Sequence, residues 1–307
     1  MTTPLPKVIV LILNWNRKDF ALNCLASLKE QEYENFEAVV VDNGSTDGSE
    51  VEIRKSYPNV RIIQNGDNLG YAGGNNQGIR LALEQGADYI FLVNNDTRFH
   101  SRCLSELVDQ GEKNPDYGIL GPVAFSYNGE NGALNSGFEL DWGLNRFFPF
   151  RYVDGRVVLN QGKEIYPVDA VQGDAFFVRR EVFERIGLFD ERFFLLGEEC
   201  DFCLNAKDAG YLTGVVKKAK FYRMISPTVG TASPLRSYYA TRNILLLIAK
   251  HVKNGQRKKI QFHFLRKVSW DLRGYFIPAS RFKNTLAHLH GCFDYFFKRF
   301  GRCRLYS

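Results

Sequence analysis

The chain has 307 residues, of which 45% are hydrophobic and 24% are charged. This composition excludes a disordered chain, and the length suits one large α/β domain with an appendage. The formal net charge of +6 is unevenly placed. Residues 236–307 hold 16 Lys and Arg against two acidic residues, whereas the preceding 235 residues hold 24 Lys and Arg against 32 acidic residues. The basic end therefore predicts a surface that meets an anionic partner.

Cysteine usage and the apolar runs bear on the cellular compartment. Of six cysteines, only Cys200 and Cys203 form a C-x-x-C pair, and we expect small buried thiols in a reducing compartment. Residues 1–7 lack the pattern of a signal peptide. No apolar run reaches the roughly 18–20 residues that span a bilayer. These features predict a cytoplasmic protein.

The first hundred residues alternate between short apolar runs and helical periodicity. Apolar runs over residues 8–13, 36–41, 60–64 and 89–93 are typical of strands buried on both faces. Helical spacing appears over residues 19–31 and 73–85, and Ser45 or Thr46 is expected to cap a helix after the second strand. This alternation predicts a parallel sheet covered by helices.

The second half of the chain is less regular. Residues 125–166 are rich in glycine and aromatic residues and are expected to form loops and short antiparallel strands that shape a pocket. A strand over 168–179, a short helix over 180–186 and a helix from the acidic group at 198 to about 209 follow. From residue 237 the chain becomes helical and basic.

Polar groups follow three of the predicted strands: Asn14-Trp15-Asn16, Asp42-Asn43 and Asn94-Asn95-Asp96. In open α/β sheets the ligand lies beyond the carboxyl ends of the strands. The order of the elements therefore predicts that these amides and carboxylates share one rim of the sheet.

A glycine-rich turn over residues 68–78 enters the helix after the third strand. Its glycines could let backbone N–H groups approach a phosphate or ribose, or the segment could be a plain turn. It is not G-x-G-x-x-G and does not follow the first strand, which disfavours a dinucleotide site.

Taken in order, several motifs resemble the family 2 glycosyltransferases, in the branch described as rhamnosyltransferase-like. The resemblance covers roughly residues 7–250. Its motifs are Asp42-Asn43-Gly44-Ser45-Thr46-Asp47, Asn68-Leu69-Gly70, Asn94-Asn95-Asp96, the Gly187–Asp190 step, Glu198-Glu199 with Asp201, and Tyr239 with Arg242-Asn243. It implies the GT-A fold, a mixed, mostly parallel sheet flanked by helices.

The resemblance also assigns roles on the donor side. Asp42 would accept a nucleobase N–H, with capping of the following turn as the alternative. Asp96 would bind Mg²⁺ or Mn²⁺, because hard cations prefer oxygen ligands and bridge diphosphates. The remaining expected nucleotide and donor contacts are Leu13, Asn14, Asn16, Asn68, Gly70, Gly74, Asn75, Asn95, Asp174 and Arg223.

On the acceptor side, Glu199 stands where the family keeps its general base, which inverting transfer needs to take the proton of the acceptor hydroxyl. Neighbouring acids repel one another and raise a pKa, but they also favour a helix N-terminus, which is the alternative. Glu198 is expected on the acceptor side, and Asp201 is expected to orient the acceptor or its loop.

Two positions depart from the family pattern: Asn205 stands where Arg is usual, and Arg223 where a metal-binding His is usual. Guanidinium has no lone pair for a metal. Three alternatives follow: a metal held by Asp96 and the diphosphate alone, direct pairing of Arg223 with phosphate, or loss of catalysis.

The resemblance and the basic end together predict a GT-A domain over residues 1–235 and a helical extension over 236–307. The extension alternates aromatic residues with Lys and Arg, which suits an anionic membrane surface at the inner face of the cell membrane. Packing on the catalytic domain is the alternative, and no nucleic-acid partner is expected.

The expected activity is inverting transfer of a hexose or deoxyhexose from a nucleoside-diphosphate sugar to a saccharide or glycolipid hydroxyl. A sugar-nucleotide-binding scaffold and a nucleotidyltransferase are the rival functions.

Overall fold

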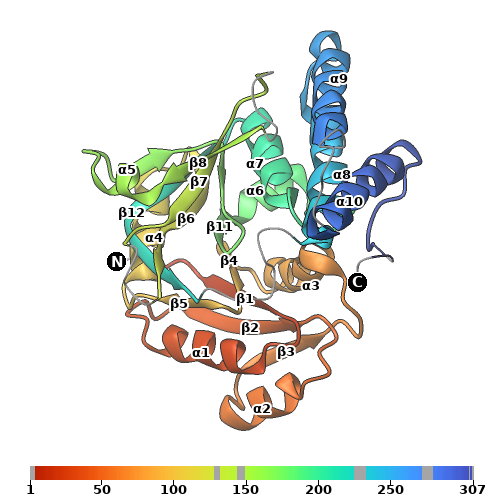
Figure 1. The fold of residues 1–307 in the computed structure, drawn as a ribbon. Helices are drawn as coiled ribbons and strands as arrows, with labels where there is room; N and C mark the ends of the chain where they lie inside the picture. Colours follow the sequence, from red (N-terminus) through yellow and green to blue (C-terminus); the bar gives the residue numbers. More distant parts are fainter. Residues whose placement is uncertain are drawn as a thin grey trace.

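The computed structural model describes residues 4–127, 132–143, 149–224, 233–271, 279–303 and 305. Helices cover both faces of a large sheet, and α8 to α10 form the C-terminal part (Figure 1). The strands are β1 (Val8–Asn14), β2 (Phe36–Asp42), β3 (Arg61–Gln64), β4 (Tyr89–Asn94), β5 (Thr97–Phe99), β6 (Tyr117–Ser126), β7 (Asn135–Leu140), β8 (Phe150–Asp154), β9 (Ile165–Pro167), β10 (Ala170–Val171), β11 (Ala175–Arg179) and β12 (Leu212–Arg223). The helices are α1 (Lys18–Lys29), α2 (Ser49–Ser56), α3 (Gly70–Glu84), α4 (Cys103–Lys113), α5 (Gly155–Leu159), α6 (Arg180–Ile186), α7 (Glu198–Asp208), α8 (Pro234–His251), α9 (Asn254–Asp271) and α10 (Ala279–Phe296).

The large sheet is mixed, as predicted. Its strand order is β3-β2-β1-β4-β11-β6-β12-β5, with β9 also paired to β12. Strands β3, β2, β1 and β4 run parallel to one another. Strand β11 is antiparallel to both β4 and β6, and β12 is parallel to β6 and antiparallel to β5. Strands β10, β7 and β8 form a separate small sheet.

Strand β1 shows why its sequence is apolar throughout. Ile9 and Leu11 join the core that includes α3, α6 and α7, whereas Val8, Val10 and Ile12 join the core under α1, α2 and α4. Successive side chains of a strand point to opposite faces, so a strand covered on both sides needs an unbroken apolar run. The prediction of a buried central strand is confirmed.

Two local predictions were wrong. Residues 168–179 are not one strand, because the turn at 172–174 separates β10 in the small sheet from β11 in the large sheet. The turn leaves Asp174 at the edge between the two sheets. Neither Ser45 nor Thr46 caps a helix: α2 begins only at Ser49, whose backbone N–H donates to Asp47 Oδ1 at 3.0 Å.

Helix α8 is packed into the molecule, with its side chains from Tyr238 to Ile248 buried except for Ala240, which is half-buried. The chain beyond α10 returns to it: Arg242 donates to the Gly301 carbonyl at 2.7 Å, and the Cys303 N–H donates to the Tyr239 hydroxyl at 2.8 Å. A separate helical extension that begins at residue 236 therefore stays a prediction. Helix α8 contacts both the catalytic part and the chain beyond α10.

Two sequence expectations concern burial and membrane spans. Cys200 and Cys203 are buried on α7, as predicted. Of the helices in the described ranges, none combines the length and the apolar character that a bilayer crossing requires.

Candidate active site

The carboxyl ends of β1, β2 and β4 meet at one rim, because the strands pair in register with Asn14 opposite Asp42 and Leu13 opposite Asn94. Asn14 links the three ends. Its Nδ2 donates to Asp42 Oδ2 at 2.9 Å, and its Oδ1 accepts from Asn95 Nδ2 at 2.7 Å. The predicted gathering of these polar groups at one edge is thus present.

Asp42 is fully buried at this rim, and so is Asn14. The Asp42 carboxylate accepts from the Ser45 N–H at 2.7 Å as well as from Asn14. Asn16 completes the link, since its Oδ1 accepts from the Thr46 N–H at 2.7 Å. Asp42 and Asn14 thus hold the turns after β1 and β2 together. This contact agrees with the alternative role of Asp42, in which its carboxylate caps the turn that follows β2. Neither side chain presents the exposed surface that direct contact with a donor needs.

The glycine-rich turn at the start of α3 makes close contacts inside the protein. A Cβ on Gly70, whose φ is +74°, would lie 2.3 Å from the Phe194 carbonyl oxygen, and the Tyr71 N–H donates to that oxygen at 2.7 Å. A Cβ on Gly74 would lie 2.7 Å from Leu13 Cδ1. These glycines let α3 approach the sheet and the loop at 194, and a role of Gly70 and Gly74 in phosphate binding stays a prediction.

Asn68 and Asn75, also predicted to contact the donor, serve the same helix. The Asn68 Oδ1 accepts from the Gly70 N–H at 2.9 Å. Asn75 is 1% exposed, and its Nδ2 donates to the Tyr71 carbonyl at 3.0 Å. The half-buried Leu13 packs beneath Gly74. Asn68, Asn75 and Leu13 therefore contact other protein groups beneath the rim.

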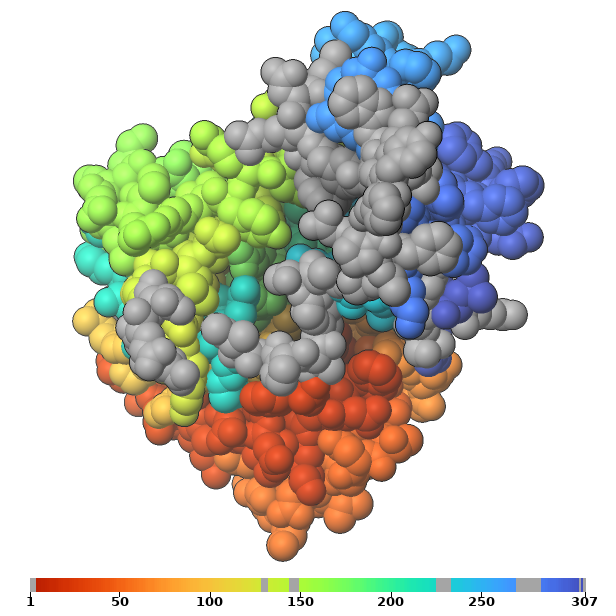
Figure 2. All heavy atoms as spheres, viewed as in Figure 1, coloured from red at the N-terminus to blue at the C-terminus, as the bar shows by residue number. Residues whose placement is uncertain are grey.

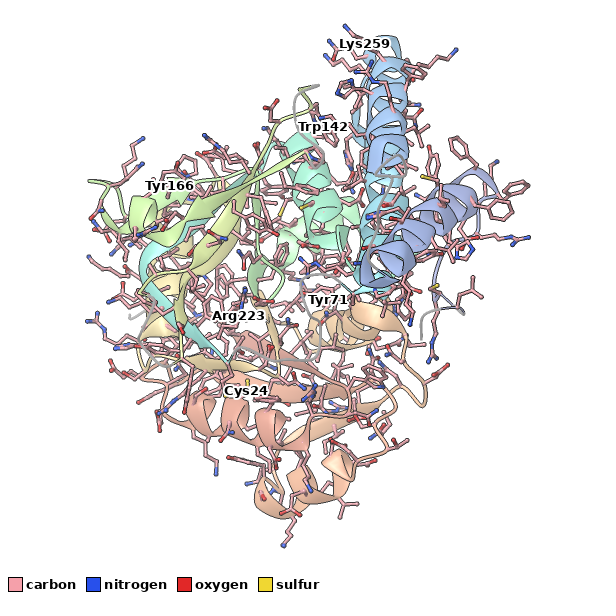
Figure 3. The ribbon with its side chains drawn as sticks, in the orientation of Figure 1. Cys24, Tyr71, Trp142, Tyr166, Arg223 and Lys259 are labelled. Atoms are coloured by element: carbon pink, nitrogen blue, oxygen red, sulfur yellow. The ribbon has the colours of Figure 1, made fainter. Side chains whose placement is uncertain are left out.

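A charged group lies on the other side of β4. Pairing of β12 with β5 sets Arg223 opposite Thr97, the residue that follows Asp96 in the chain. The next residue of the other chain segment, Met224, donates its N–H to the Asp96 carbonyl at 2.9 Å. The Arg223 guanidinium contacts the Asp174 carboxylate, whose Oδ1 accepts from Asn94 Nδ2 at 2.9 Å. Figure 3 shows Arg223 near the middle of the molecule, and in Figure 2 cyan atoms from the end of β12 reach the surface between the N-terminal and yellow-green parts.

The residues near Asp96 do not fit a divalent metal held by the protein. Such a cation prefers several oxygen ligands. In the described ranges no three His, Cys, Asp or Glu side chains gather into a metal site, and residues 225–232, next along the chain, include none of these types. Burial raises the pKa of Asp96, and the charges of Arg223 and Arg17 offset only part of this effect. One carboxylate beside a guanidinium is a poor donor set for Mg²⁺ or Mn²⁺, which removes the support for Asp96 as a metal ligand.

Glu199 lines a cavity of about 510 Å³ together with Asp174, Arg223 and Arg236. It lies in the first turn of α7, where its Oε2 accepts from the Gly197 N–H at 3.0 Å. Burial raises the pKa of Glu199, while backbone hydrogen bonds and the charge of Arg236 act in the opposite direction. A carboxylate in this setting can take a proton from a hydroxyl group.

A second cavity of about 200 Å³ adjoins the first, because Glu199, Arg236 and Tyr152 line both. Its other lining is mostly apolar: Phe138, Phe150, Leu196, Gly197, Cys200, Ala240, Asn243, Ile244 and Leu247. Glu199 therefore lies at the junction between a charged cavity and an apolar one.

The other two acids in the first turn of α7 do not face this junction. Glu198 is 4% exposed, its Oε2 has no hydrogen-bond partner among the described residues, and burial raises its pKa well above the ordinary value. Asp201 is 2% exposed and accepts from Lys250 at 2.7 Å, with His251 Nε2 also 2.7 Å away. Glu198 is thus buried and Asp201 anchors α7 to α8, so the role of both on the acceptor side stays a prediction.

The departure at Asn205 has an explanation in the same contacts. Asn205 Nδ2 lies 3.3 Å from Asp201 Oδ2, one helical turn away. The positive partners of Asp201 come from α8, as Lys250 and His251. An arginine at position 205 is therefore not needed to pair with this acid.

Sequence reasoning missed Arg236 and gave Asn243 no role. Arg236 lies in the first turn of α8, and no local pattern marks it as facing Glu199 across 37 residues. Asn243 Nδ2 donates to the carbonyls of Phe193, Leu195 and Leu196 at 3.0, 2.8 and 2.7 Å. The Arg242-Asn243 pair in the resemblance was the available signal for Asn243.

Comparisons with known proteins show what this chain is similar to. The N-acetylglucosaminyl-diphospho-decaprenol L-rhamnosyltransferase of Mycobacterium tuberculosis is 27% identical over 244 residues, 72% of this chain and 78% of that protein. The dTDP-rhamnosyl transferase RfbF of Shigella flexneri is 26% identical over 258 residues, 80% of each chain.

Among solved structures, mannosyltransferase PcManGT from Pyrobaculum calidifontis, in complex with GDP-Man and Mn²⁺, shares the fold. Its TM-score is 0.60 at 14% identity, covering 97% of this chain and 89% of that one. The predicted GT-A fold is confirmed. Residues 9–187, more than half of the chain, match the family model "Glycosyl transferase family 2", and the chain accordingly belongs to this family of glycosyltransferases, on its rhamnosyltransferase-like side.

Proposed function

We propose that this glycosyltransferase moves a hexose or deoxyhexose, with inversion, from a nucleoside-diphosphate sugar to the hydroxyl group of a saccharide or lipid-linked saccharide. The observation that carries the proposal is the position of Glu199. This carboxylate lines the same cavity as Arg223 and Asp174 and also borders the apolar cavity. Donor and acceptor can thus meet at one potential base.

The chemistry assigned to Glu199 is a single displacement. The acceptor oxygen attacks the anomeric carbon while the bond from that carbon to the diphosphate oxygen breaks, so the configuration inverts. Glu199 takes the proton that the acceptor hydroxyl loses, and the nucleoside diphosphate leaves with the bonding electron pair. A pKa raised by burial strengthens the carboxylate as a base.

The apolar cavity supports an acceptor with a lipid portion. Phe150, Ile244 and Leu247 contribute to its wall, and Arg236 stands at its junction with the charged cavity. A guanidinium there suits a phosphate between sugar and lipid. The Mycobacterium tuberculosis relative is named for a diphospho-decaprenol substrate, which belongs to the same chemical class.

A basic aromatic surface on α9 and α10 supports attachment to an anionic membrane. The two helices are joined by a hydrogen bond from Gln261 Nε2 to the Tyr295 hydroxyl at 2.9 Å. Figure 3 shows Lys259 at the outer end of α9. The surface consists of exposed Lys258, Lys259 and Phe262 of α9, Phe293 and Phe296 of α10, and Phe297, Lys298 and Arg299 directly after α10. Such a surface fits the headgroup layer, whereas Trp270, Tyr275 and Phe276 of the predicted set lie outside the described side chains.

A donor and acceptor screen tests the proposal. The purified chain is incubated with UDP-, dTDP- and GDP-linked hexoses and deoxyhexoses, with lipid-diphosphate-linked and free saccharides as acceptors. Mass spectrometry is expected to detect one added sugar on a lipid-linked acceptor, and NMR of the product is expected to show an inverted anomeric configuration. A retained configuration contradicts the displacement at Glu199, and absence of transfer from all donors contradicts the proposal.

A further inference from the structure

A diphosphate leaving group needs a positive charge beside it, because negative charge develops on its oxygens as the sugar departs. The solved neighbour from Pyrobaculum calidifontis is in complex with Mn²⁺ and GDP-Man. The residues around Asp96 in this chain do not fit a protein-held metal, as shown above. The charge must then come from elsewhere in the site.

Arg223 is built into the position from which it can supply that charge. It ends β12, and backbone pairing with both β5 and β6 fixes its Cα opposite Thr97 and Ser126. Its side chain keeps 30% of its surface exposed and lines the cavity that also contains Glu199. The strand pairing, more than the side chain's own contacts, decides where this guanidinium stands.

The guanidinium is oriented and still has donors to offer. It contacts the Asp174 carboxylate and the Gln172 Oε1 through its NH2 group. Asp174 is itself held by Asn94 at 2.9 Å. Arg223 Nε is buried and has no hydrogen-bond partner among the described residues. A guanidinium carries five N–H donors in a planar fork that matches phosphate oxygens, so the contacts to Asp174 and Gln172 leave donors for a ligand.

From these observations, and building on the proposed function, we infer that Arg223 binds the donor diphosphate directly and takes the place of the divalent metal ion. Asp174 then acts as a positioning residue for the guanidinium. The positive charge of Arg223 would repel a metal cation bound close to it. The site can therefore hold either the metal ion or this guanidinium beside the diphosphate, but not both. The chain is therefore expected to bind a nucleoside diphosphate without a metal.

The test is calorimetric titration of the full chain with UDP, dTDP and GDP, in EDTA and in excess Mn²⁺. The wild-type chain is expected to bind at least one of them with the same Kd under both conditions. Arg223→His is expected to weaken that binding in EDTA by at least about tenfold, the loss of one charge-assisted contact, and to regain part of it when Mn²⁺ is added. Arg223→Lys keeps the charge and is expected to retain weaker, metal-independent binding.

Lys218→Ala is the matched control, since it removes an exposed cation from the same strand, where it pairs with Glu164. It is expected to bind like the wild-type chain. Thermal unfolding of each variant separates loss of binding from loss of folding. Wild-type binding that requires Mn²⁺ overturns the role of Arg223 and leaves the proposed transfer intact. If none of the three nucleotides binds under either condition, both proposals are overturned.

Discussion

Glu198 and Glu199 are neighbours in the chain with different surroundings. Glu199 borders both cavities, whereas the Glu198 carboxyl is buried and its pKa is raised well above the ordinary value by that burial. Glu199→Gln is expected to lower kcat by about 10²–10⁴-fold, because the general base is lost. Nucleotide affinity should stay unchanged, as measured by initial rates together with calorimetry.

Glu198→Gln is the matched control, because an amide resembles the neutral carboxyl group that burial favours at this position. It is expected to keep near wild-type turnover. If the Glu199 variant retains turnover, or if the two variants lose it equally, the assignment of the base is wrong.

The buried Glu198 also predicts a dependence of stability on pH. Its pKa in the folded chain lies above the value of 4.5 for an exposed glutamate, so the folded state holds a proton that the unfolded state releases. The free energy of unfolding should therefore fall as pH rises above about 4.5, at up to about 1.4 kcal/mol per pH unit, until the folded-state pKa is reached. Urea unfolding of wild type and Glu198→Gln across this range measures it. The stability of the variant relative to wild type should increase with pH. If the free energies of unfolding of the two proteins change in parallel with pH, the pKa of Glu198 is not raised in the folded chain.

At the scale of elements, the segment before α7 is held by α8. Phe194 and Leu196 have φ angles of 62° and 70°, a left-handed conformation that costs energy in residues with side chains. Asn243 donates to three carbonyl groups of this segment, and Arg242 donates to the Phe193 carbonyl at 2.7 Å. The strained segment leads directly into Gly197 and Glu199.

Asn243→Ala is expected to destabilise the fold by about 1–3 kcal/mol, because buried carbonyl groups lose their donor. It should also lower kcat more than it raises the nucleotide Kd, because Glu199 moves while the rim at Asp42 does not. Urea unfolding and rate measurements check the two effects. Asn243→Asp keeps the shape and the acceptor for Arg242 Nε but has no donor, so it should behave like the alanine variant. An aspartate variant with wild-type rates would show that the donated hydrogen bonds do not position Glu199.

At the scale of the whole molecule, deleting residues 253–307 is a poor test of membrane binding. The deletion would remove Gly301 and Cys303, which are tied to Arg242 and Tyr239 of α8, together with α10, whose Asp294 accepts from the Tyr238 hydroxyl at 2.6 Å. Surface substitutions on the basic aromatic surface leave these contacts in place. They isolate the membrane contribution from the stability of the fold.

Replacing Phe296 and Phe297 together by Ser is expected to lower binding to anionic vesicles by roughly tenfold, because two exposed rings no longer enter the headgroup layer. Replacing Lys258 and Lys259 by Glu should weaken binding to phosphatidylserine vesicles and leave neutral vesicles unaffected. Flotation with vesicles measures both. Val51→Ser, on exposed α2 in another part of the molecule, is the control (Figure 1). If the variant with Phe296 and Phe297 replaced floats with vesicles as the wild-type chain does, the proposal that this surface binds the membrane is refuted.

The alternating strands and helices of the first hundred residues were predictable because local periodicity reports burial directly. Strands β6 and β12 and helix α4 were not anticipated, and the break at 172–174 was missed, because an apolar run does not show which of two sheets each part joins. In the site, the gathering of Asn14, Asp42 and Asn95 followed from strand order. Their burial did not, since a polar residue after a strand can face either solvent or a neighbouring turn.

By itself, the residue pattern determined the alternating strands and helices and the rim at which the polar strand ends meet, because these depend on local periodicity and chain order. The family and the mixed sheet were implied by the resemblance of the motifs. Only the tertiary structure decided which acids face the cavity and which residues orient the cation beside Asp96. The antiparallel pairing of β12 with β5 places Arg223 beside Asp96. Asp201 instead pairs with Lys250 and His251 of α8 and does not line the cavity. Such contacts join residues far apart in the chain, and their free energy depends on packing that no local segment encodes.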